Sequence, residues 1–253
     1  MRNKAKIATL YTFLFITLVA LLSVGFVQAQ VIAPGVKQGM VFVYELTSYW
    51  TTSDPSSSIP TELLMINQTT VVEVRISTVN NTHVTVASPW YFKDGTYNIE
   101  RGAVNLHTGD GYGFVGIIAA NLNVGDKIHP NGQDGLKVLD TTKKNYGSSS
   151  RATNHVHIVD DDTVNGLKGT RDLYFDKETG ILVEQKDKAE TTKAPFVTSQ
   201  VIWKISYVEG VDDWTISDTF PWTTVLLVII ISVSTAVIVI VYNKKIATPK
   251  TTN

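Results

Sequence analysis

The chain has 253 residues, 43% of them hydrophobic, and a formal net charge of −1 at neutral pH. The absence of cysteine excludes disulfide bonds, thiol catalysis, cysteine-ligated zinc and iron–sulfur clusters. All 23 acidic residues but only 16 of the 22 basic residues lie between positions 30 and 220, so this part has a net charge of −7. Because phosphate backbones require clustered positive charge, no nucleic-acid partner is expected.

The amino-terminal segment, residues 1–29, has the pattern of a secretory signal peptide. Three basic residues precede an apolar run at residues 7–27, and small side chains at the −3 and −1 positions predict cleavage after Ala29. The apolar run is somewhat long for a signal peptide, so an uncleaved anchor is the alternative. Both interpretations place the residues that follow on the exported side of a membrane.

Residues 30–208 are predicted to form an antiparallel β domain, because apolar and polar residues alternate with a period of two. Three successive runs between positions 41 and 92 are rich in valine, threonine and aromatic residues. Asparagine tolerates a positive φ, so Asn80 and Asn81 predict a hairpin corner between the second and third runs. Pro89 is expected to end the third run.

The segments between these runs and beyond them contain turns and two candidate helices. Five glycines between positions 102 and 116 predict bends or a loop over the sheet. Residues 135–140 are predicted to be a strand, and the polar stretch 141–151 is either an exposed loop or an edge strand protected by lysines. The stretches 61–68 and 117–122 are each long enough for a short helix.

The stretch from Leu173 to Gln185 contains three acidic residues and raises the question of an acid–base site. Gly180 supplies the positive φ that a short hairpin turn requires, and Asp176 can accept hydrogen bonds from the turn's backbone. We therefore interpret the stretch as a β-hairpin corner whose acids lie in water. Counting all such hairpins predicts eight to ten strands in a strongly curved antiparallel meander sheet, either a half-barrel or sandwich-like.

The carboxy-terminal part predicts a membrane anchor. Residues 209–221 form an acidic stalk, and residues 222–242 carry no charge over about 30 Å of helix, enough to span a bilayer. The lysines within residues 243–253 predict a short cytoplasmic tail. The chain is thus expected to be a single-pass protein of the cell membrane with its β domain outside. A cleaved GPI-type signal and a buried β-rich segment are the alternatives.

Several motifs recur in a familiar order. They are the sequences at 35–46 (GVKQGMVFVYEL), 92–96 (FKDGT), 113–128 (GFVGIIAANLNVGDKI) and 173–184 (LYFDKETGILVE), followed by the terminal apolar run. In this pattern the chain resembles uncharacterised archaeal surface proteins. The resemblance implies a signal peptide, a single β-rich outer domain and a C-terminal transmembrane helix, but no activity. The pattern is also similar to the half-barrels that carry lipid or lipoprotein cargo.

One group of residues is a candidate metal site. His155 and His157 lie two positions apart, on the same side of a predicted strand, and Asp160, Asp161 and Asp162 follow closely. Because the sequence indicates no third ligand, solvent-facing strand histidines without a metal are the preferred interpretation, and a shared metal ion is the alternative. The three aspartates also suggest a loose calcium site, although an EF-hand is excluded because no helices flank the loop.

The sequence contains no motif that predicts catalysis or a cofactor. It lacks a Gly-x-Ser-x-Gly elbow and a phosphate-binding loop. Asn67 and Asn80 are candidate glycosylation sites on the exported side. We predict a non-enzymatic surface or envelope protein that acts through other envelope proteins or glycans. The alternatives are a carrier or sensor of a hydrophobic ligand in a half-barrel, with strand aromatics lining the site, and an envelope hydrolase.

Overall fold

The computed structural model describes residues 32–146, 149–162 and 166–209. Within these ranges the chain forms ten β-strands and one short helix. In chain order the elements are β1 (Val41–Thr52), α2 (Thr61–Gln68), β2 (Thr69–Asn80), β3 (His83–Phe92), β4 (Tyr97–Asn105), β5 (Gly111–Tyr112), β6 (Asp140–Tyr146), β7 (Ser149–Asp162), β8 (Leu167–Asp176), β9 (Leu182–Thr191) and β10 (Val197–Glu209).

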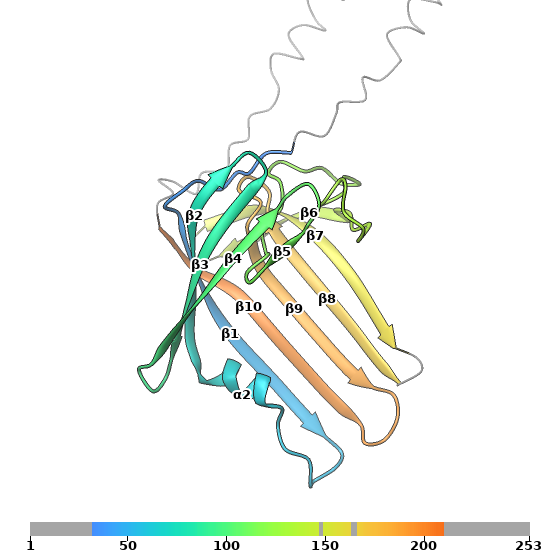
Figure 1. Cartoon of the computed structure of the whole chain (residues 1–253). Coiled ribbons are helices and arrows are strands. Elements are labelled where there is room, and N and C mark those ends of the chain that lie inside the picture. Colours follow the sequence, from blue (N-terminus) through green and yellow to red (C-terminus); the bar gives the residue numbers. More distant parts are fainter. Residues whose placement is uncertain (1–31, 147–148, 163–165, 210–253) are drawn as a thin grey trace, which may run out of the picture. The chain divides into compact units, whose positions relative to one another are not determined.

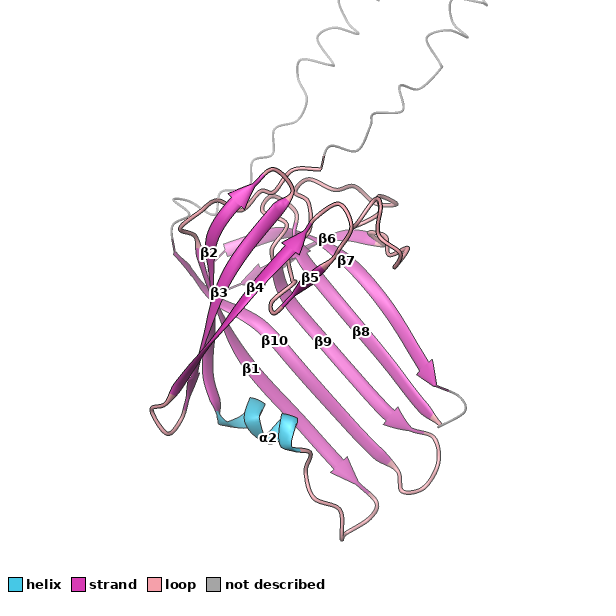
Figure 2. Cartoon of the chain, in the orientation of Figure 1, coloured by secondary structure: helices cyan, strands magenta, loops and turns pink. Residues whose placement is uncertain are grey.

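The ten strands belong to one antiparallel sheet with the order β5-β4-β3-β2-β1-β10-β9-β8-β7-β6 (Figure 1, Figure 2). Each half of the sheet is a meander in which consecutive strands pair. The first and last strands join the two halves, with β1 and β10 paired from Val41↔Glu209 to Thr52↔Val197. Strands β5 and β6 are the free edges, so the sheet is open. The predicted all-β antiparallel meander is confirmed, whereas the sandwich alternative, which needs two sheets, is wrong for the described residues.

The sheet is strongly curved, as a contact between two tryptophans shows. Trp90 lies on β3 and Trp203 on β10, with β2 and β1 between them. In a flat sheet these positions would be about 14 Å apart. Their ring centroids are nevertheless 5.3 Å apart in an edge-to-face arrangement with an interplanar angle of 87°. The sheet therefore bends around one of its faces, which we call the inner face, and β3 and β4 pass in front of β1 and β10 in Figure 1.

The alternating apolar residues of the sequence form the inner face. The predicted alternation is confirmed in β1, where Phe42, Tyr44 and Leu46 are buried while Glu45 and Thr47 are exposed on the outer face. The buried side of β2 and β3 likewise carries the valines and the isoleucine that the period of two assigned to it. A second part of the core is made by β7 to β9 and the long connection between β5 and β6. Its buried members are Ile118, Ala119, Leu122, Ile128, Val138, Val156, Phe175 and Leu182.

The turn predictions are largely confirmed by the backbone. Asn81 has a φ of 50° at the corner between β2 and β3, and Gly180 has a φ of 73° between β8 and β9. Residues 61–68 form the expected short helix, α2. The polar stretch after position 140 forms an edge strand, β6, rather than a loop.

Three local predictions are wrong. Pro89 does not end its strand, because β3 runs on to Phe92 and Pro89 pairs with Ile99 of β4. The pairing between β3 and β2 is interrupted at this point, so no ladder hydrogen bond from the missing N–H is lost. Residues 117–122 form no helix, and residues 135–140 make only an isolated bridge before β6 begins. Both stretches belong to the connection over the inner face, where packing overrides local preference.

The predicted targeting and membrane segments fall outside the described ranges. These are the signal peptide (1–29), all but the first residue of the stalk (209–221), the transmembrane helix (222–242) and the tail (243–253). Among the described residues, no helix is both long and apolar enough to cross a membrane. Export, anchoring and orientation therefore stay predictions from the sequence.

Candidate functional site

Residues 113–139 connect the two free edges of the sheet and pass over its inner face. We call this segment the strap. Its backbone is tied to the turn between β8 and β9, since Ile118 N–H donates to the Gly180 carbonyl (2.9 Å) and Leu182 N–H donates to the Gly116 carbonyl (2.8 Å). A Cβ at Gly116 would lie 3.0 Å from Leu182 Cβ, closer than side chains normally approach. The strap is therefore packed against the sheet at this point and encloses space beside it.

A cavity of about 450 Å³ lies between the strap and the inner face. Four aromatic side chains contribute to its wall: Trp90, Phe114, Phe175 and Trp203. Aliphatic residues from the sheet and the strap complete most of the remainder, including Ile118, Ile128, Leu136, Ile158, Leu173 and Leu182. The volume and the apolar lining are typical of sites for small organic ligands.

Two polar atoms of the cavity wall lack a hydrogen-bond partner among the described residues. They are Ser88 Oγ and His129 Nε2, both buried. The other ring nitrogen of His129 lies 2.8 Å from Asp134 Oδ2, which fixes the orientation of the imidazole. An unpaired buried polar group costs about 1–3 kcal/mol. A polar group of a ligand, or a water molecule, would remove this cost at each atom.

The exposed part of the cavity lining is charged. Glu100 and Arg171 line the cavity and are solvent-exposed. Arg171 Nε donates to Asp187 Oδ1 (2.8 Å), and the neighbouring Gln185 donates to Asp187 Oδ2 (2.6 Å). The cavity thus combines an apolar interior with a polar boundary, an arrangement suited to an amphipathic molecule.

A second group of functional side chains lies on the outer face, away from the cavity. His155 and His157 of β7 point to the same side of the strand, as predicted. Asp172 is the direct partner of His157 on β8. Asp172 Oδ1 lies 2.8 Å from His155 Nε2 and 2.8 Å from His157 Nδ1. The three ligand atoms lie within 4.8 Å of one another and form a group that can hold a metal ion.

The structure changes which acids belong to this group. Asp160, Asp161 and Asp162 lie further along β7 and are not among the grouped ligands. Asp172 takes their place, a residue that is distant in sequence and becomes a neighbour only through the pairing of β7 with β8. Partial burial tends to raise the pKa of Asp172, but hydrogen bonds and charge from His155 and His157 outweigh it and hold the pKa below its usual value.

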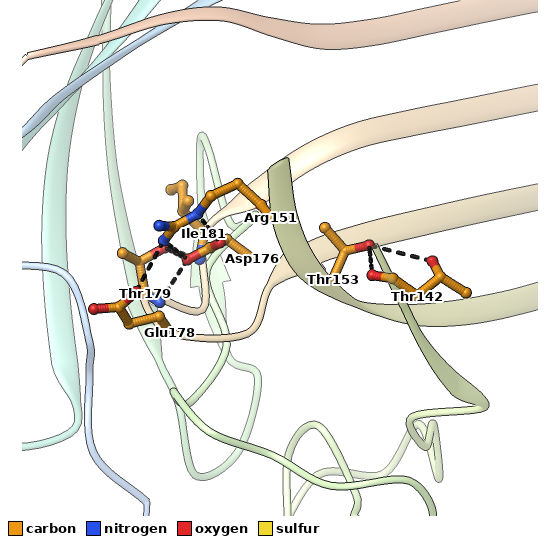
Figure 3. Close-up of polar contacts among 7 residues, drawn as sticks. All are labelled: Thr142, Arg151, Thr153, Asp176, Glu178, Thr179 and Ile181. Carbon is orange, nitrogen blue, oxygen red and sulfur yellow. Dashed lines mark hydrogen bonds and ion pairs between the residues drawn. The ribbon is translucent and has the colours of Figure 1, made fainter. Parts of the chain in front are cut away.

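The hairpin corner between β8 and β9 is confirmed as a turn, but its acids do not all lie in water. Asp176 is buried and paired with Arg151 of β7 through Nε (2.7 Å) and Nη2 (2.9 Å), as Figure 3 shows. It also accepts hydrogen bonds from the backbone N–H (2.8 Å) and hydroxyl (2.7 Å) of Thr179. Glu178 alone is exposed, and Glu184 is buried beside Lys144 and Tyr146. The contacts of Asp176 with Arg151 and Thr179 therefore hold the strap's anchoring turn in place, whereas Glu184 links β9 to β6.

Both predicted glycosylation sites lie on the surface of the β domain. Asn67 is exposed on α2, and Asn80 is exposed at the hairpin corner between β2 and β3. The hydroxyl of Thr69, which completes the first site, is engaged with the Met65 carbonyl (2.8 Å). Both asparagines are therefore accessible to modification. The sequon hydroxyl is already hydrogen-bonded at the Asn67 site.

No protein-family model matches the sequence, and a comparison with curated proteins finds no significant match. The resemblance to archaeal surface proteins accordingly stays a prediction. The cavity and the outer-face cluster are the two features from which function can be argued.

Proposed function

We propose that the β domain is the binding module of a carrier or sensor of a small hydrophobic ligand, with the ligand held in the cavity under the strap. The observation that carries this proposal is the cavity itself, which has about 450 Å³ of space and a mostly apolar wall. A sheet whose inner face served only as a core would be filled by side chains, because protein interiors pack as densely as organic crystals.

The shape of the sheet is consistent with this function. The open, curved arrangement is that of a half-barrel, and the strap covers part of its inner face. Curved sheets of this type can hold one small ligand among inward-facing side chains. The unpaired Ser88 Oγ and His129 Nε2 offer one hydrogen bond each, and Arg171 and Glu100 offer charge at the boundary. We therefore expect an amphipathic ligand, with an acyl or similar chain inside and a polar group near these atoms.

The sequence supplies the cellular setting of the proposal. A signal peptide, a transmembrane helix and a cytoplasmic tail would display the domain outside the cell membrane, close to a source of lipid. The broader hypothesis of a surface protein that acts through other envelope proteins or glycans explains the same location, but it does not require a cavity. An envelope hydrolase has less support, since Ser88 Oγ and His129 Nε2 are not hydrogen-bonded to each other within the described part of the chain.

Fatty acids of increasing length test the proposal. Each buried methylene contributes about 0.8 kcal/mol, so two added carbons should strengthen binding about tenfold until the cavity is filled. The full-length chain, held in amphipol, is titrated with these acids in competition with a dansyl-labelled fatty acid that is excited directly. An affinity that does not depend on chain length would contradict binding in a cavity of fixed size.

Two variants of the strap provide a matched pair for this assay. Leu136 lines the cavity, whereas Leu139 is 58% exposed on the same segment. Leu136→Trp should fill the cavity and weaken binding at least tenfold, and Leu139→Trp should bind as the unmodified chain does. Equal affinity in the two variants would place the ligand elsewhere.

A further inference from the structure

The cluster on the outer face brings two imidazole nitrogens and one carboxylate oxygen together at one point. A single oxygen, Asp172 Oδ1, receives two imidazole nitrogens at 2.8 Å, one from His155 and one from His157. We propose that His155, His157 and Asp172 bind a divalent transition-metal ion of the zinc class. This site lies on the opposite face from the ligand cavity and is independent of the function proposed for it.

The donor set fits such an ion. Two imidazole nitrogens and one carboxylate oxygen are a common protein contribution to a zinc site, with water or another donor in the fourth position. Ligand bonds of about 2.0–2.1 Å in a tetrahedral site require donor atoms about 3.3 Å apart. The three atoms lie within 4.8 Å of one another, so small side-chain rotations suffice. The side chain of His157 is 38% exposed, which leaves one side of the site open to water.

The sheet holds the three ligands on a rigid frame. His155 and His157 are two positions apart on β7, so both point to the outer face. Asp172 is paired with His157 across the ladder, where opposite side chains are close neighbours. Ligands on paired strands are positioned more accurately than ligands on loops.

A second layer of contacts orients one of the histidines. Asp140 Oδ2 lies 3.1 Å from His155 Nδ1, and the imidazole is stacked on the ring of Tyr174 with centroids 4.6 Å apart and 9° between the planes. With an ion bound at Nε2, the ring proton of the neutral imidazole would lie on Nδ1, where it can be donated to Asp140. Metal-binding histidines commonly have this support, a carboxylate that accepts a hydrogen bond from the nitrogen not bound to the metal.

Electrostatic repulsion from the nearby lysines does not prevent cation binding at the cluster. Lys186 is the ladder partner of Asp172 on β9, and Lys144 lies over the ring of Tyr174. Both ammonium groups are paired with Glu184, at 2.8 Å from Lys186 and 2.7 Å from Lys144. Their charge is therefore partly neutralised within the protein.

Zinc titration tests the site directly. The full-length chain without a polyhistidine tag, held in amphipol, is titrated with zinc chloride in a calorimeter. One zinc ion per chain is expected to bind with micromolar or higher affinity. Replacing zinc with cobalt(II) should produce visible absorption bands typical of nitrogen and oxygen ligands in a low-coordinate site.

Variants distinguish zinc binding at this cluster from nonspecific zinc binding elsewhere on the chain. His157→Ala and Asp172→Asn should each weaken binding at least a hundredfold, and Asp140→Asn about tenfold because it supports His155 indirectly. His83→Ala is the matched control, an exposed strand histidine outside the cluster, and should bind zinc normally. Circular dichroism checks that each variant is folded, and the partly exposed His157 provides a variant that tolerates replacement if Asp172→Asn does not.

Two results would overturn the proposal: no zinc binding by the unmodified chain at micromolar concentrations, or binding that persists when His157 and Asp172 are replaced. The first result would indicate a hydrogen-bonded group in which both imidazoles donate N–H to Asp172. Fatty-acid binding in the same samples is a separate readout, so failure of the metal site does not decide the function of the cavity.

Discussion

Replacing Asp176 by asparagine removes one charge from a carboxylate that four donor atoms hold beneath the strap. Two of these atoms belong to the Arg151 guanidinium, at 2.7 and 2.9 Å, and two belong to Thr179, at 2.8 and 2.7 Å. The side chains of Arg151 and Asp176 are 3% and 1% exposed. The variant therefore leaves a buried guanidinium without its principal counter-charge.

The expected cost follows from this burial. Removing one partner of a buried ion pair typically costs about 3–5 kcal/mol. Asparagine keeps the size of the side chain and can still accept a hydrogen bond from Thr179, so we expect a value near 3 kcal/mol. Because a domain of this kind is stable by only about 5–15 kcal/mol, the loss should be easily measured.

An exposed pair in the neighbouring strands supplies the control. Arg171 Nε and Asp187 Oδ1 are 2.8 Å apart, but their side chains are 52% and 29% exposed. Asp187→Asn should cost less than about 1 kcal/mol, since water screens the pair. Urea unfolding of the full-length chain, followed by tryptophan fluorescence, gives both values. Equal losses for the two variants would refute the argument that burial of the pair decides its contribution.

Two further predictions concern the backbone of the strap's anchoring turn and the titration of the core. Gly180→Ala should destabilise the fold by more than about 2 kcal/mol, because φ is 73° and the new Cβ would clash with the Ile118 carbonyl oxygen. Gly39→Ala is the control, since Gly39 has a φ of 90° but open space around it. It should cost only about 1 kcal/mol in the same urea assay. A similar loss in both would show that the close approach is relieved without strain. Burial raises the pKa of Tyr44 well above the ordinary tyrosine value of about 10. Above pH 10 the tyrosine ionises in the unfolded chain before it ionises in the folded domain. The contribution of Tyr44 to stability is therefore intact below pH 10 and is lost as the pH rises further. Tyr44→Phe should reduce the decline of unfolding free energy between pH 10 and 11 by up to about 1.4 kcal/mol, and an unchanged slope would contradict this assignment.

Local sequence signals were sufficient for the elements of the sheet. The period of two identifies the buried side of β1 and β2. The need for a positive φ at Asn81 and Gly180 indicates the β2–β3 and β8–β9 turns. Such signals depend on neighbours along the chain, which a sequence shows directly. They predicted strand pairs and a curved meander, but they could not show that β1 pairs with β10.

The candidate sites depend on contacts between distant residues and were only partly predicted. The sequence identified His155 and His157 but not Asp172, because that contact depends on the register between β7 and β8. The five glycines between positions 102 and 116 predict bends or a loop over the sheet, but not the cavity beneath it. The sequence predicts that Asp176 lies in a solvent-exposed turn, because its partner Arg151 is 25 residues away and the burial of the pair depends on that distant contact.

The pairing of β1 with β10 has a consequence for the order in which the domain is made. Strands β1 to β5 and β6 to β10 can each assemble from neighbours in sequence, but the seam between the two meanders needs β10, the last strand of the described part. During synthesis, one edge of β1 would stay unpaired until β10 has been made, and an unpaired apolar strand readily pairs with other chains. Closing this long-range seam should therefore be the slow step of maturation. A chain truncated before Val197 would retain β1 as a free edge and should form aggregates.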